Sequence, residues 1–482
     1  MGGQDVKRAR DLFRIAPAWH TGLTSDEYSY TQVANSWYKS PNMKTAAAIE
    51  QKPVVYHHVE GEIPIDLPEG AFISVSRKAP LKIYSVGFQP AKSIPEIPRW
   101  FLRKHGSAPF TVLEPFAGSG TTIVEALRYG ASVCWLDYQP LSRLICKVKT
   151  TRFFPGEITA EASKVIREAI NKKNAPVTVQ FANKDFWFQK PVQEGLEILR
   201  EMIFSSREVV RPVLLLAFAS TVRKSSNMND GMILAARRVH IEEIPIRSRS
   251  DVFNIFQFYV NKLIDAIIEW NALLNGNVPK VVKLLSDDAR KVDSNLTYDA
   301  VITSPPYINA IDYVWASKFE LHWLGMTLTD SDRLDLYTKE IGTERIPREE
   351  CKELGRTGHL YLDALIEQIY IGRKYKATKG QNQMRARVVY KYFIDMQKHF
   401  DSTFLNLRPG GSYCFTIGDM SRICGVDIPV ASLLTELACE VGFREKFHFH
   451  LLLKNRQLNI PRNVDWAGTI KHDTTVVLEK PA

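Results

Sequence analysis

Two prolines and a tyrosine follow an apolar run in the stretch TYDAVITSPPYINAIDYVWASKFE, residues 297–320. Because proline has a fixed φ and no N–H, the pair stiffens this turn and leaves carbonyl oxygens free to accept hydrogen bonds. The Ser304 hydroxyl and the Pro305 carbonyl could hold an amino group, and the Tyr307 ring offers a flat face to a planar base. The candidate catalytic residues are therefore Ser304, Pro305, Pro306 and Tyr307. The alternative is an ordinary Pro-Pro turn beside a half-buried tyrosine, which is the commoner meaning of this motif on its own.

Two acceptors and an aromatic face suit a reaction at an aromatic amine. The exocyclic amine of cytosine or adenine is a poor nucleophile because its lone pair is conjugated into the ring. Acceptors for both of its N–H groups would favour a tetrahedral nitrogen, which could then attack a sulfonium methyl group in line. This chemistry needs no covalent intermediate on the protein, so no obligatory cysteine is expected.

A glycine-rich loop, 114-EPFAGSGTT-122, stands where a strand is expected to end and a helix to begin. Gly118 and Gly120 let the backbone approach a ligand closely, and the start of the helix offers unpaired N–H groups. A loop for nucleotide triphosphates would need a lysine after its last glycine, and a full dinucleotide fingerprint would need a third glycine where Ile123 stands. A tight turn without a ligand is the alternative for a bare Gly-x-Gly.

Carboxylates at the ends of neighbouring strands favour a nucleoside ligand. Asp137 ends the next expected strand, where an acidic side chain can accept hydrogen bonds from ribose hydroxyls, and Asp288 could face an adenine edge. Close backbone approach without a phosphate-binding lysine describes S-adenosyl-L-methionine. The candidate cofactor-binding residues are Lys92, Glu114, Phe116, Gly118, Gly120, Thr121, Asp137 and Asp288. Lys92 could lie near the cofactor carboxylate or could simply be solvated.

The elements that position these residues alternate between strands and helices. The pattern predicts strands at 111–114, 131–137, 281–290 and 298–307, with a helix at 119–130 and a largely helical stretch at 157–280. A later helix (384–407), strand (412–419), helix (428–443) and two strands near 445–454 and 474–479 follow. We therefore expect one α/β sheet domain with two insertions.

The expected organisation has six parts. They are an N-terminal segment of unclear role (1–75), a cofactor-binding half (76–156), a mostly helical insertion (157–280), a catalytic half (281–325), a variable basic region (326–394) and the C-terminal part of the sheet (395–482). Either insertion could contact DNA.

Composition adds a weaker indication. The 482 residues carry 63 Lys and Arg against 53 Asp and Glu, a net charge of +10, which leans toward a polyanionic partner. The six cysteines and the histidines show no metal-ligand spacing, so no metal site is expected, and His448 and His450 are interpreted as packing or surface residues. With no apolar N-terminal segment and no apolar run long enough for a membrane span, the predicted location is cytoplasmic.

The two motifs together resemble those of the DNA amino-methyltransferases. EPFAGSGTT is similar to the family's cofactor loop, DPFxGSGTT, and TSPPY is similar to its catalytic motif. The segments 84–98, 307–325 and 407–419 also resemble this family, so that the similarity covers about 80–150, 281–325 and 395–480. Glu114 departs from the pattern because the family usually has Asp there.

The resemblance implies a fold, a reaction and partners. It implies a Rossmann-like S-adenosylmethionine-dependent sheet of seven strands whose last strands form an antiparallel hairpin. It also implies methyl transfer to a base flipped out of double-stranded DNA, in a restriction–modification system with a cognate restriction endonuclease acting on the same site. A serine before Pro-Pro resembles the cytosine-N4 branch. Adenine N6 (in DNA or RNA) is the nearest alternative, and a non-catalytic nucleic-acid-binding subunit is the alternative from another class.

Two basic segments are candidates for contact with DNA. The stretch 373–391 has seven Lys and Arg and no Asp or Glu, and a second cationic stretch lies at 221–231 with further arginines up to Arg249. The candidates are Arg373, Lys374, Lys376, Lys379, Arg385 and Arg387 in the first segment and Arg223 and Lys224 in the second. A solvated loop and an exposed helix face are the alternative interpretation.

Overall fold

The structure is a computed structural model of the 482-residue chain. It describes residues 56–76, 80–90, 92–107, 109–229, 232–234, 236, 244–274, 282–292, 296–308, 311–376, 380–453 and 472–482. Most of the N-terminal segment 1–75, together with Arg237, Arg238 and Lys379, lies outside these residues.

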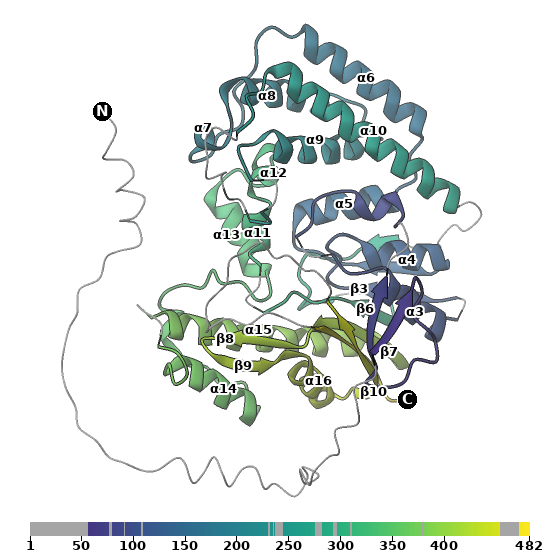
Figure 1. The fold of residues 1–482 in the computed structure, drawn as a ribbon, viewed down its shortest axis with the longest axis vertical. Coiled ribbons are helices and arrows are strands. Elements are labelled where there is room, and N and C mark those ends of the chain that lie inside the picture. Colours follow the sequence, from purple (N-terminus) through teal and green to yellow (C-terminus); the bar gives the residue numbers. More distant parts are fainter. Residues whose placement is uncertain are drawn as a thin grey trace, which may run out of the picture.

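A large central sheet organises the described part of the chain (Figure 1). Its nine strands run in the order β1-β2-β10-β11-β7-β6-β3-β4-β5. Neighbouring strands are parallel except at β11, which is antiparallel to both β10 and β7. The strands are β1 (Tyr56–Glu60), β2 (Phe72–Ser76), β3 (Thr111–Glu114), β4 (Ser132–Trp135), β5 (Val282–Leu284), β6 (Tyr298–Thr303), β7 (Leu407–Gly418), β10 (Arg444–Leu452) and β11 (His472–Glu479). A separate hairpin joins β8 (Met420–Ile423) and β9 (Val426–Pro429).

The sheet confirms the expected α/β class and the antiparallel pairing of the last two strands. It is also wider than the seven strands that the resemblance implies. The two added strands, β1 and β2, come from the segment whose role was unclear. They extend the sheet because β2 pairs in parallel with β10, with Phe72 opposite His450.

Helices cover both faces of the sheet. Successive side chains of a strand point to opposite faces, and those on both faces are buried, so each face needs a covering layer. In β3, Val112 belongs to the core on one face and Leu113 to the core on the other. Figure 1 shows α4, α5 and the helical insertion on one side, and α14, α15 and α16 on the other. The first set comprises α3 (Glu96–His105), α4 (Thr121–Tyr129), α5 (Pro140–Thr150), α6 (Pro155–Asn171), α8 (Lys190–Phe204), α9 (Arg211–Ser225) and α10 (Arg249–Leu273). The second comprises α14 (Leu360–Tyr370), α15 (Gln381–Asn406) and α16 (Val430–Val441).

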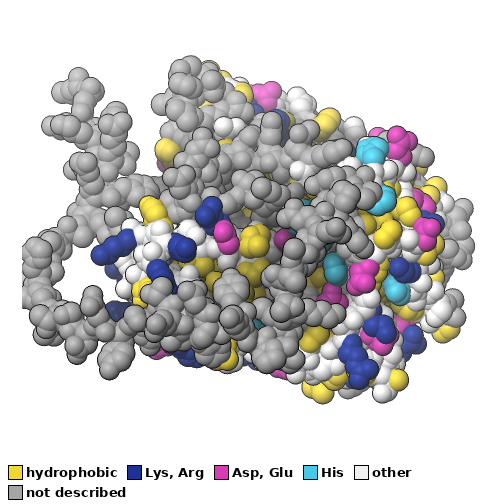
Figure 2. Space-filling model, turned by 60° about the horizontal axis from the view of Figure 1, so that its bottom comes forward, with side chains coloured by type: hydrophobic (Ala, Val, Ile, Leu, Met, Phe, Trp, Pro, Cys, Tyr) yellow, Lys and Arg dark blue, Asp and Glu magenta, His cyan; other side chains and the backbone are white. Residues whose placement is uncertain are grey.

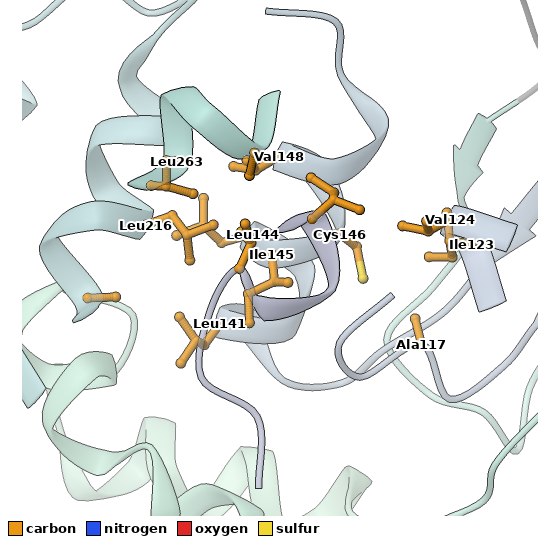
Figure 3. Close-up of a cluster of buried hydrophobic side chains, with 14 of the residues drawn as sticks. Ala117, Ile123, Val124, Leu141, Leu144, Ile145, Cys146, Val148, Leu216 and Leu263 are labelled. Atoms are coloured by element: carbon orange, nitrogen blue, oxygen red, sulfur yellow. The ribbon is translucent and has the colours of Figure 1, made fainter. Parts of the chain in front are cut away.

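The helical insertion shares its core with the sheet. Side chains of α5, among them Leu144 and Val148, meet Leu216 of α9 and Leu263 of α10 in one buried cluster (Figure 3). The long α10 begins at a capping box, in which Ser248 and Asp251 satisfy each other's backbone N–H groups. The insertion is thus an outer layer of helices built onto α5.

Two expected boundaries fall inside helices. Helix α6 starts at Pro155, just before the expected boundary at 156/157, and α15 runs through 394/395 as one element. Shorter elements complete the described chain: η2 (Lys82–Ser85), α7 (Lys184–Trp187), α11 (Tyr313–Ala316), α12 (Lys318–Trp323), α13 (Asp330–Lys339) and η4 (Glu350–Lys352). Among the described helices, none combines the length and apolar character needed to cross a bilayer.

Truncating the contact between α9 and α5 tests whether the insertion and the sheet share one core. Leu216 is 1% exposed, so Leu216→Ala should lower the free energy of unfolding by about 2–5 kcal/mol, through lost burial and the cavity left behind. Ile268 on α10 is 51% exposed, so Ile268→Ala should change the free energy of unfolding by no more than about 0.5 kcal/mol. Chemical denaturation of both variants is the measurement, and equal effects would contradict the shared core.

Candidate functional site

The two sequence motifs meet because β3 and β6 are parallel neighbours. Their register pairs Val112 with Ala300 and Leu113 with Val301, so the chain leaves both strands at the same edge of the sheet. Glu114 ends β3 and Thr303 ends β6, and the Thr303 hydroxyl donates a hydrogen bond to the Glu114 carboxylate. The glycine loop and the TSPPY turn therefore start side by side.

Glu114 forms the base of the glycine loop. Its Oε1 atom also accepts the backbone N–H of Phe116 at 3.0 Å. The side chain is 2% exposed, and this burial raises its pKa to about 7, although the bonds from Thr122, Thr303 and Phe116 act in the opposite direction. In this chain, the acidic residue that departs from the family pattern connects its own loop to the neighbouring strand.

Both glycines of the loop adopt left-handed backbone conformations. Gly118 has φ 48° and Gly120 has φ 74°, which side chains rarely tolerate. A Cβ on Gly120 would also lie 3.2 Å from the sulfur of Cys146, which packs under the loop from α5 (Figure 3). Gly120 then leads directly into α4. The loop therefore requires glycine for its backbone shape and, at Gly120, for packing.

Asp137 lies against the glycine loop. Its Oδ2 accepts the N–H of Gly118 at 2.7 Å, and its Oδ1 accepts the N–H of Gln139 at 2.8 Å. Burial raises its pKa to about 6, while the two backbone bonds favour the charged form. Each carboxylate oxygen has a second lone pair, so Asp137 can hold the loop and still accept a hydrogen bond from a ligand.

Asp288 is held by a neighbouring cation. Arg290 donates to Oδ1 through Nε at 2.8 Å and to Oδ2 through a terminal nitrogen at 3.0 Å. The pKa of Asp288 lies below its usual value because these bonds outweigh the effect of burial, and Arg290 also bridges to Asp395 at 3.4 Å. Much of the acceptor capacity of Asp288 is thus used within the protein.

Of the other cofactor candidates, Phe116 and Thr121 belong to the loop and Lys92 lies in the segment before it. The Phe116 ring meets the edge of His399 at a centroid distance of 4.9 Å, and Thr121 is buried with its hydroxyl 3.0 Å from that of Ser119. The Lys92 ammonium donates to the carbonyls of residues 84 and 87, at 3.2 and 3.0 Å. Burial, followed by the nearby charge of Lys262, lowers the pKa of Lys92 to about 8.

Three separate elements anchor the TSPPY turn. Ser304 donates from Oγ to the carbonyl of Thr416 in β7 at 3.1 Å. The Tyr392 hydroxyl, from α15, donates to the Pro306 carbonyl at 3.1 Å. The Tyr307 hydroxyl donates to Oδ1 of Asp473 in β11 at 2.9 Å. These anchors restrict the conformation of the turn and of the Tyr307 ring.

Sequence reasoning missed the residues that support the motifs from a distance. Tyr392 and Asp473 carry no local signal, because each reaches the turn only through the folding of a later element. Gln89 lies in the segment 84–98, which resembles the DNA amino-methyltransferases, but nothing in the sequence singled it out within that segment. Its Oε1 is buried without a partner in the described part of the chain, and its Nε2 would lie 3.6 Å from a Cβ placed on Gly118.

Glu340 is a further buried carboxyl close to the site. It follows α13, is 4% exposed, and accepts the backbone N–H of Tyr313 at 3.1 Å. Burial, followed by the nearby charge of Asp312, raises its pKa to about 8. The carboxyl is therefore largely protonated at neutral pH.

The basic segment 373–391 divides into paired and exposed cations. Arg385 pairs with Glu344, and Arg387 pairs with Glu353 at 3.0 Å. These two arginines are only 18% and 12% exposed. Arg373, Lys374 and Lys376 are exposed on the turn after α14, and Lys379 lies outside the described residues. The surface charge thus concentrates at the start of the segment.

The second basic segment divides in the same way. Arg223 donates to the buried Glu320 at 3.0 Å and to the Ala316 carbonyl at 3.0 Å, and its guanidinium stacks over Phe88. Lys224, the next residue, is exposed. Arg223 therefore ties the insertion to the helices that follow the TSPPY turn, whereas Lys224 lies on the surface.

No protein-family model matches the chain. It is nevertheless similar over most of its length to curated proteins named type II methyltransferases. M.MvaI of Kocuria varians is 23% identical over 403 residues, covering 78% of this chain and 85% of that protein. M.BsoBI of Geobacillus stearothermophilus is 23% identical over 413 residues (77% and 80%), and M.AvaI of Nostoc sp. is 24% identical over 424 residues (77% and 82%).

The raised pKa of Glu340 predicts a pH dependence of stability. The folded state holds the Glu340 proton more tightly than the unfolded state does. Protonation of Glu340 therefore stabilises the folded protein, and this contribution is complete below the ordinary carboxyl pKa. It is lost as the pH rises toward about 8. Glu340→Gln cannot titrate, so its free energy of unfolding should fall less than that of the wild type between pH 5 and pH 8.

Denaturant unfolding across this pH range measures the difference. Glu208→Gln is the matched control because the Glu208 side chain is 89% exposed. Its free energy of unfolding should change with pH as that of the wild type does. If the free energy of unfolding of Glu340→Gln changes with pH as much as that of the wild type, the pKa of Glu340 is not raised by folding.

Proposed function

We propose that this protein is a DNA methyltransferase that transfers a methyl group from S-adenosylmethionine to the exocyclic N4 amine of cytosine. The base would be flipped out of double-stranded DNA, and the enzyme would modify the site cut by a cognate restriction endonuclease. The observation that carries the proposal is the junction of β3 and β6, where the glycine loop and the TSPPY turn leave the sheet side by side. The similarity to type II methyltransferases over 77–78% of the chain supports it.

The residues around the glycine loop fit S-adenosylmethionine. When bound, this cofactor supplies an electrophilic methyl group on a sulfonium sulfur. Gly118, in the left-handed conformation, presents backbone without a side chain. The buried Oε1 of Gln89, which has no partner in the described part of the chain, supplies an acceptor close to it. Asp137 retains acceptor capacity for ribose hydroxyls. The proposed cofactor-binding set is Lys92, Glu114, Phe116, Gly118, Gly120, Thr121, Asp137 and Asp288, to which Gln89 is added.

The Ser304 hydroxyl is oriented to accept a hydrogen bond from the target amine. It has one proton, and that proton is directed to the carbonyl of Thr416. Its lone pairs are then available for an N–H donor. The carbonyl of Pro306 already accepts from Tyr392, so the carbonyl of Pro305 remains our proposed second acceptor. Two acceptors would shift the amine toward a tetrahedral nitrogen that can attack the methyl group.

Tyr307 would stack on the flipped base. Its hydroxyl is fixed by Asp473, which limits rotation of the ring, so little conformational freedom is lost when the base binds. Stacking on an aromatic side chain is worth about 1–3 kcal/mol per base. Tyr307 thus acts through its ring, and Asp473 acts as a positioning residue through the tyrosine hydroxyl.

The serine before Pro-Pro favours cytosine N4 as the target. Adenine N6 is the alternative that keeps the same site, since both bases present an exocyclic amine and a flat face. A binding subunit without activity is the alternative from another class. It is disfavoured because the glycine loop and the turn are both intact and joined by a buried hydrogen bond.

Methylation of unmethylated bacterial DNA tests the proposal directly. Full-length protein with S-adenosylmethionine should produce N4-methylcytosine, identified by mass spectrometry after digestion to nucleosides. Ser304→Ala removes a transition-state acceptor, and Tyr307→Ala removes the stacking face. Each should lower kcat/KM by about 10- to 100-fold, since about 1.4 kcal/mol corresponds to tenfold in rate. Tyr307→Phe should keep most of the activity because the ring is retained.

Tyr129→Ala is the matched control. This tyrosine ends α4 and is 38% exposed, so its loss should leave kcat/KM unchanged. N6-methyladenine as the product would correct the base and retain the site. Cofactor binding without product on DNA or RNA would reject the proposed activity, and absence of cofactor binding would support the binding-subunit alternative.

The exposed cations after α14 are our proposed contact with the DNA backbone. Lys374 and Lys376 are exposed, whereas Arg385 and Arg387 are held by glutamates. The double variant Lys374→Ala/Lys376→Ala should weaken DNA binding at all sequences. It should also reduce the slope of log K against log salt by about 2, because each phosphate contact contributes about 0.9.

The salt dependence of binding, measured by fluorescence anisotropy, checks this contact. Lys147→Ala, which removes an exposed lysine of α5, is the control and should keep the wild-type slope. If Lys224→Ala lowers the slope and the double variant does not, the second basic segment is the contact instead.

A further inference from the structure

Three side chains of metal-ligand type meet at the end of the sheet next to the TSPPY turn. Asp419 directly follows β7, His450 lies in β10, and His472 begins β11. One potential ligand atom from each residue lies within 4.8 Å of those of the other two. All three residues are partly buried. Because they come from β10, from β11 and from the end of β7, their spacing in the sequence resembles no metal motif.

The hydrogen bonds of the cluster determine which ring nitrogen of His450 carries the proton. Thr474 donates from Oγ1 to Oδ1 of Asp419 at 3.0 Å, and the same Oγ1 lies 2.9 Å from Nδ1 of His450. The hydroxyl has a single proton and gives it to the carboxylate, so it must accept from His450 Nδ1–H. Nε2 of the neutral ring then carries the free lone pair, as in a metal-binding histidine whose other nitrogen donates to a supporting group.

The other ligands are also held in place. Nε2 of His472 lies 3.1 Å from Oδ2 of Asp419, so the carboxylate lies between Thr474 and this ring. Phe72 of β2 stacks on His450 with centroids 4.4 Å apart and meets His472 edge-on at 5.4 Å. A ligand set fixed before binding loses little conformational entropy when the ion enters.

We propose that Asp419, His450 and His472 form a binding site for a divalent transition-metal cation of the zinc class. Two imidazoles and one carboxylate suit zinc, whereas magnesium and calcium prefer sites built of oxygen atoms alone. A fourth position would be open to water. The sequence predicted no metal site, and His450 was interpreted as a packing or surface residue. The site does not depend on the proposed methyl transfer.

Such an ion would join the ends of β7, β10 and β11. His472 directly precedes Asp473, whose carboxylate accepts from the Tyr307 hydroxyl, so the ion would also fix the support of that ring. In the view of Figure 2, histidine and acidic side chains lie near one another on the right of the molecule. Entry from solvent is consistent with the partial exposure of all three ligands.

Zinc binding to the full-length protein tests the site. The protein is treated with EDTA, the chelator is removed, and Zn²⁺ alone is titrated by calorimetry, with elemental analysis after dialysis. We expect one zinc per chain. His450→Ala and His472→Ala should each abolish stoichiometric binding, and Thr474→Ala should weaken it by about 10- to 100-fold, because it removes only the supporting hydroxyl.

His448→Ala is the matched control. This histidine lies in the same strand as His450, but its Nδ1 bonds to Glu445 at 2.9 Å, so its loss should leave the stoichiometry unchanged. Absence of zinc binding would overturn the site. So would binding that survives both His450→Ala and His472→Ala, since the ion would then sit elsewhere.

A measurement on the wild type keeps the test valid if the histidine variants fail to fold. X-ray absorption of the zinc-loaded protein should show four light ligands, two of them imidazoles, and Co²⁺ in its place should give the visible bands of a four-coordinate site. Fewer than two imidazoles, or the spectrum of a six-coordinate ion, would overturn the proposed ligand set.

Discussion

The hydrogen bond between Thr303 and Glu114 is the contact on which the arrangement of the site depends. It joins the last residues of β3 and β6, which are also the first residues of the two motifs. Both side chains are buried. Removing the Glu114 carboxylate would leave the Thr303 hydroxyl without this acceptor, at a cost of about 1–3 kcal/mol, whereas Glu114 also accepts the N–H of Phe116. The glycine loop and the TSPPY turn are therefore held at a fixed separation by the sheet and by this bond together.

The second layer of the site comes from elements that are distant in the sequence. Thr416 of β7, Tyr392 of α15 and Asp473 of β11 each hold one residue of the turn. A site supported in this way is organised before its ligands arrive, which lowers the entropy that binding must overcome. The same sheet end carries Asp419, His450 and His472, so the support for Tyr307 and the proposed metal site belong to one structural unit.

Several arginines of the two basic segments form ion pairs within the protein. Arg223, Arg385 and Arg387 are three of the most prominent cations of the basic segments, yet each pairs with a glutamate in the described structure. Arg223 connects α9 to α12, and Arg385 and Arg387 connect α15 to the segment before α14. Arginines paired in this way contribute less to the surface potential than exposed ones. Exposed cations of the first basic segment, such as Lys374 and Lys376, lie on the surface where a polyanion could reach them.

The sequence by itself determined the α/β class, the strand–turn–helix at the glycine loop and the TSPPY turn, because each rests on local residue patterns and on backbone needs such as the positive φ of Gly118 and Gly120. Only the tertiary structure decided that β1 and β2 widen the sheet, that Asp137 and Asp288 are already engaged by Gly118 and Arg290, and that Asp419, His450 and His472 meet. The physical reason is that hydrogen bonds and ligand clusters of this kind depend on strand pairing between segments far apart in the chain, and neither periodicity nor spacing in the sequence encodes which distant side chains that pairing brings together.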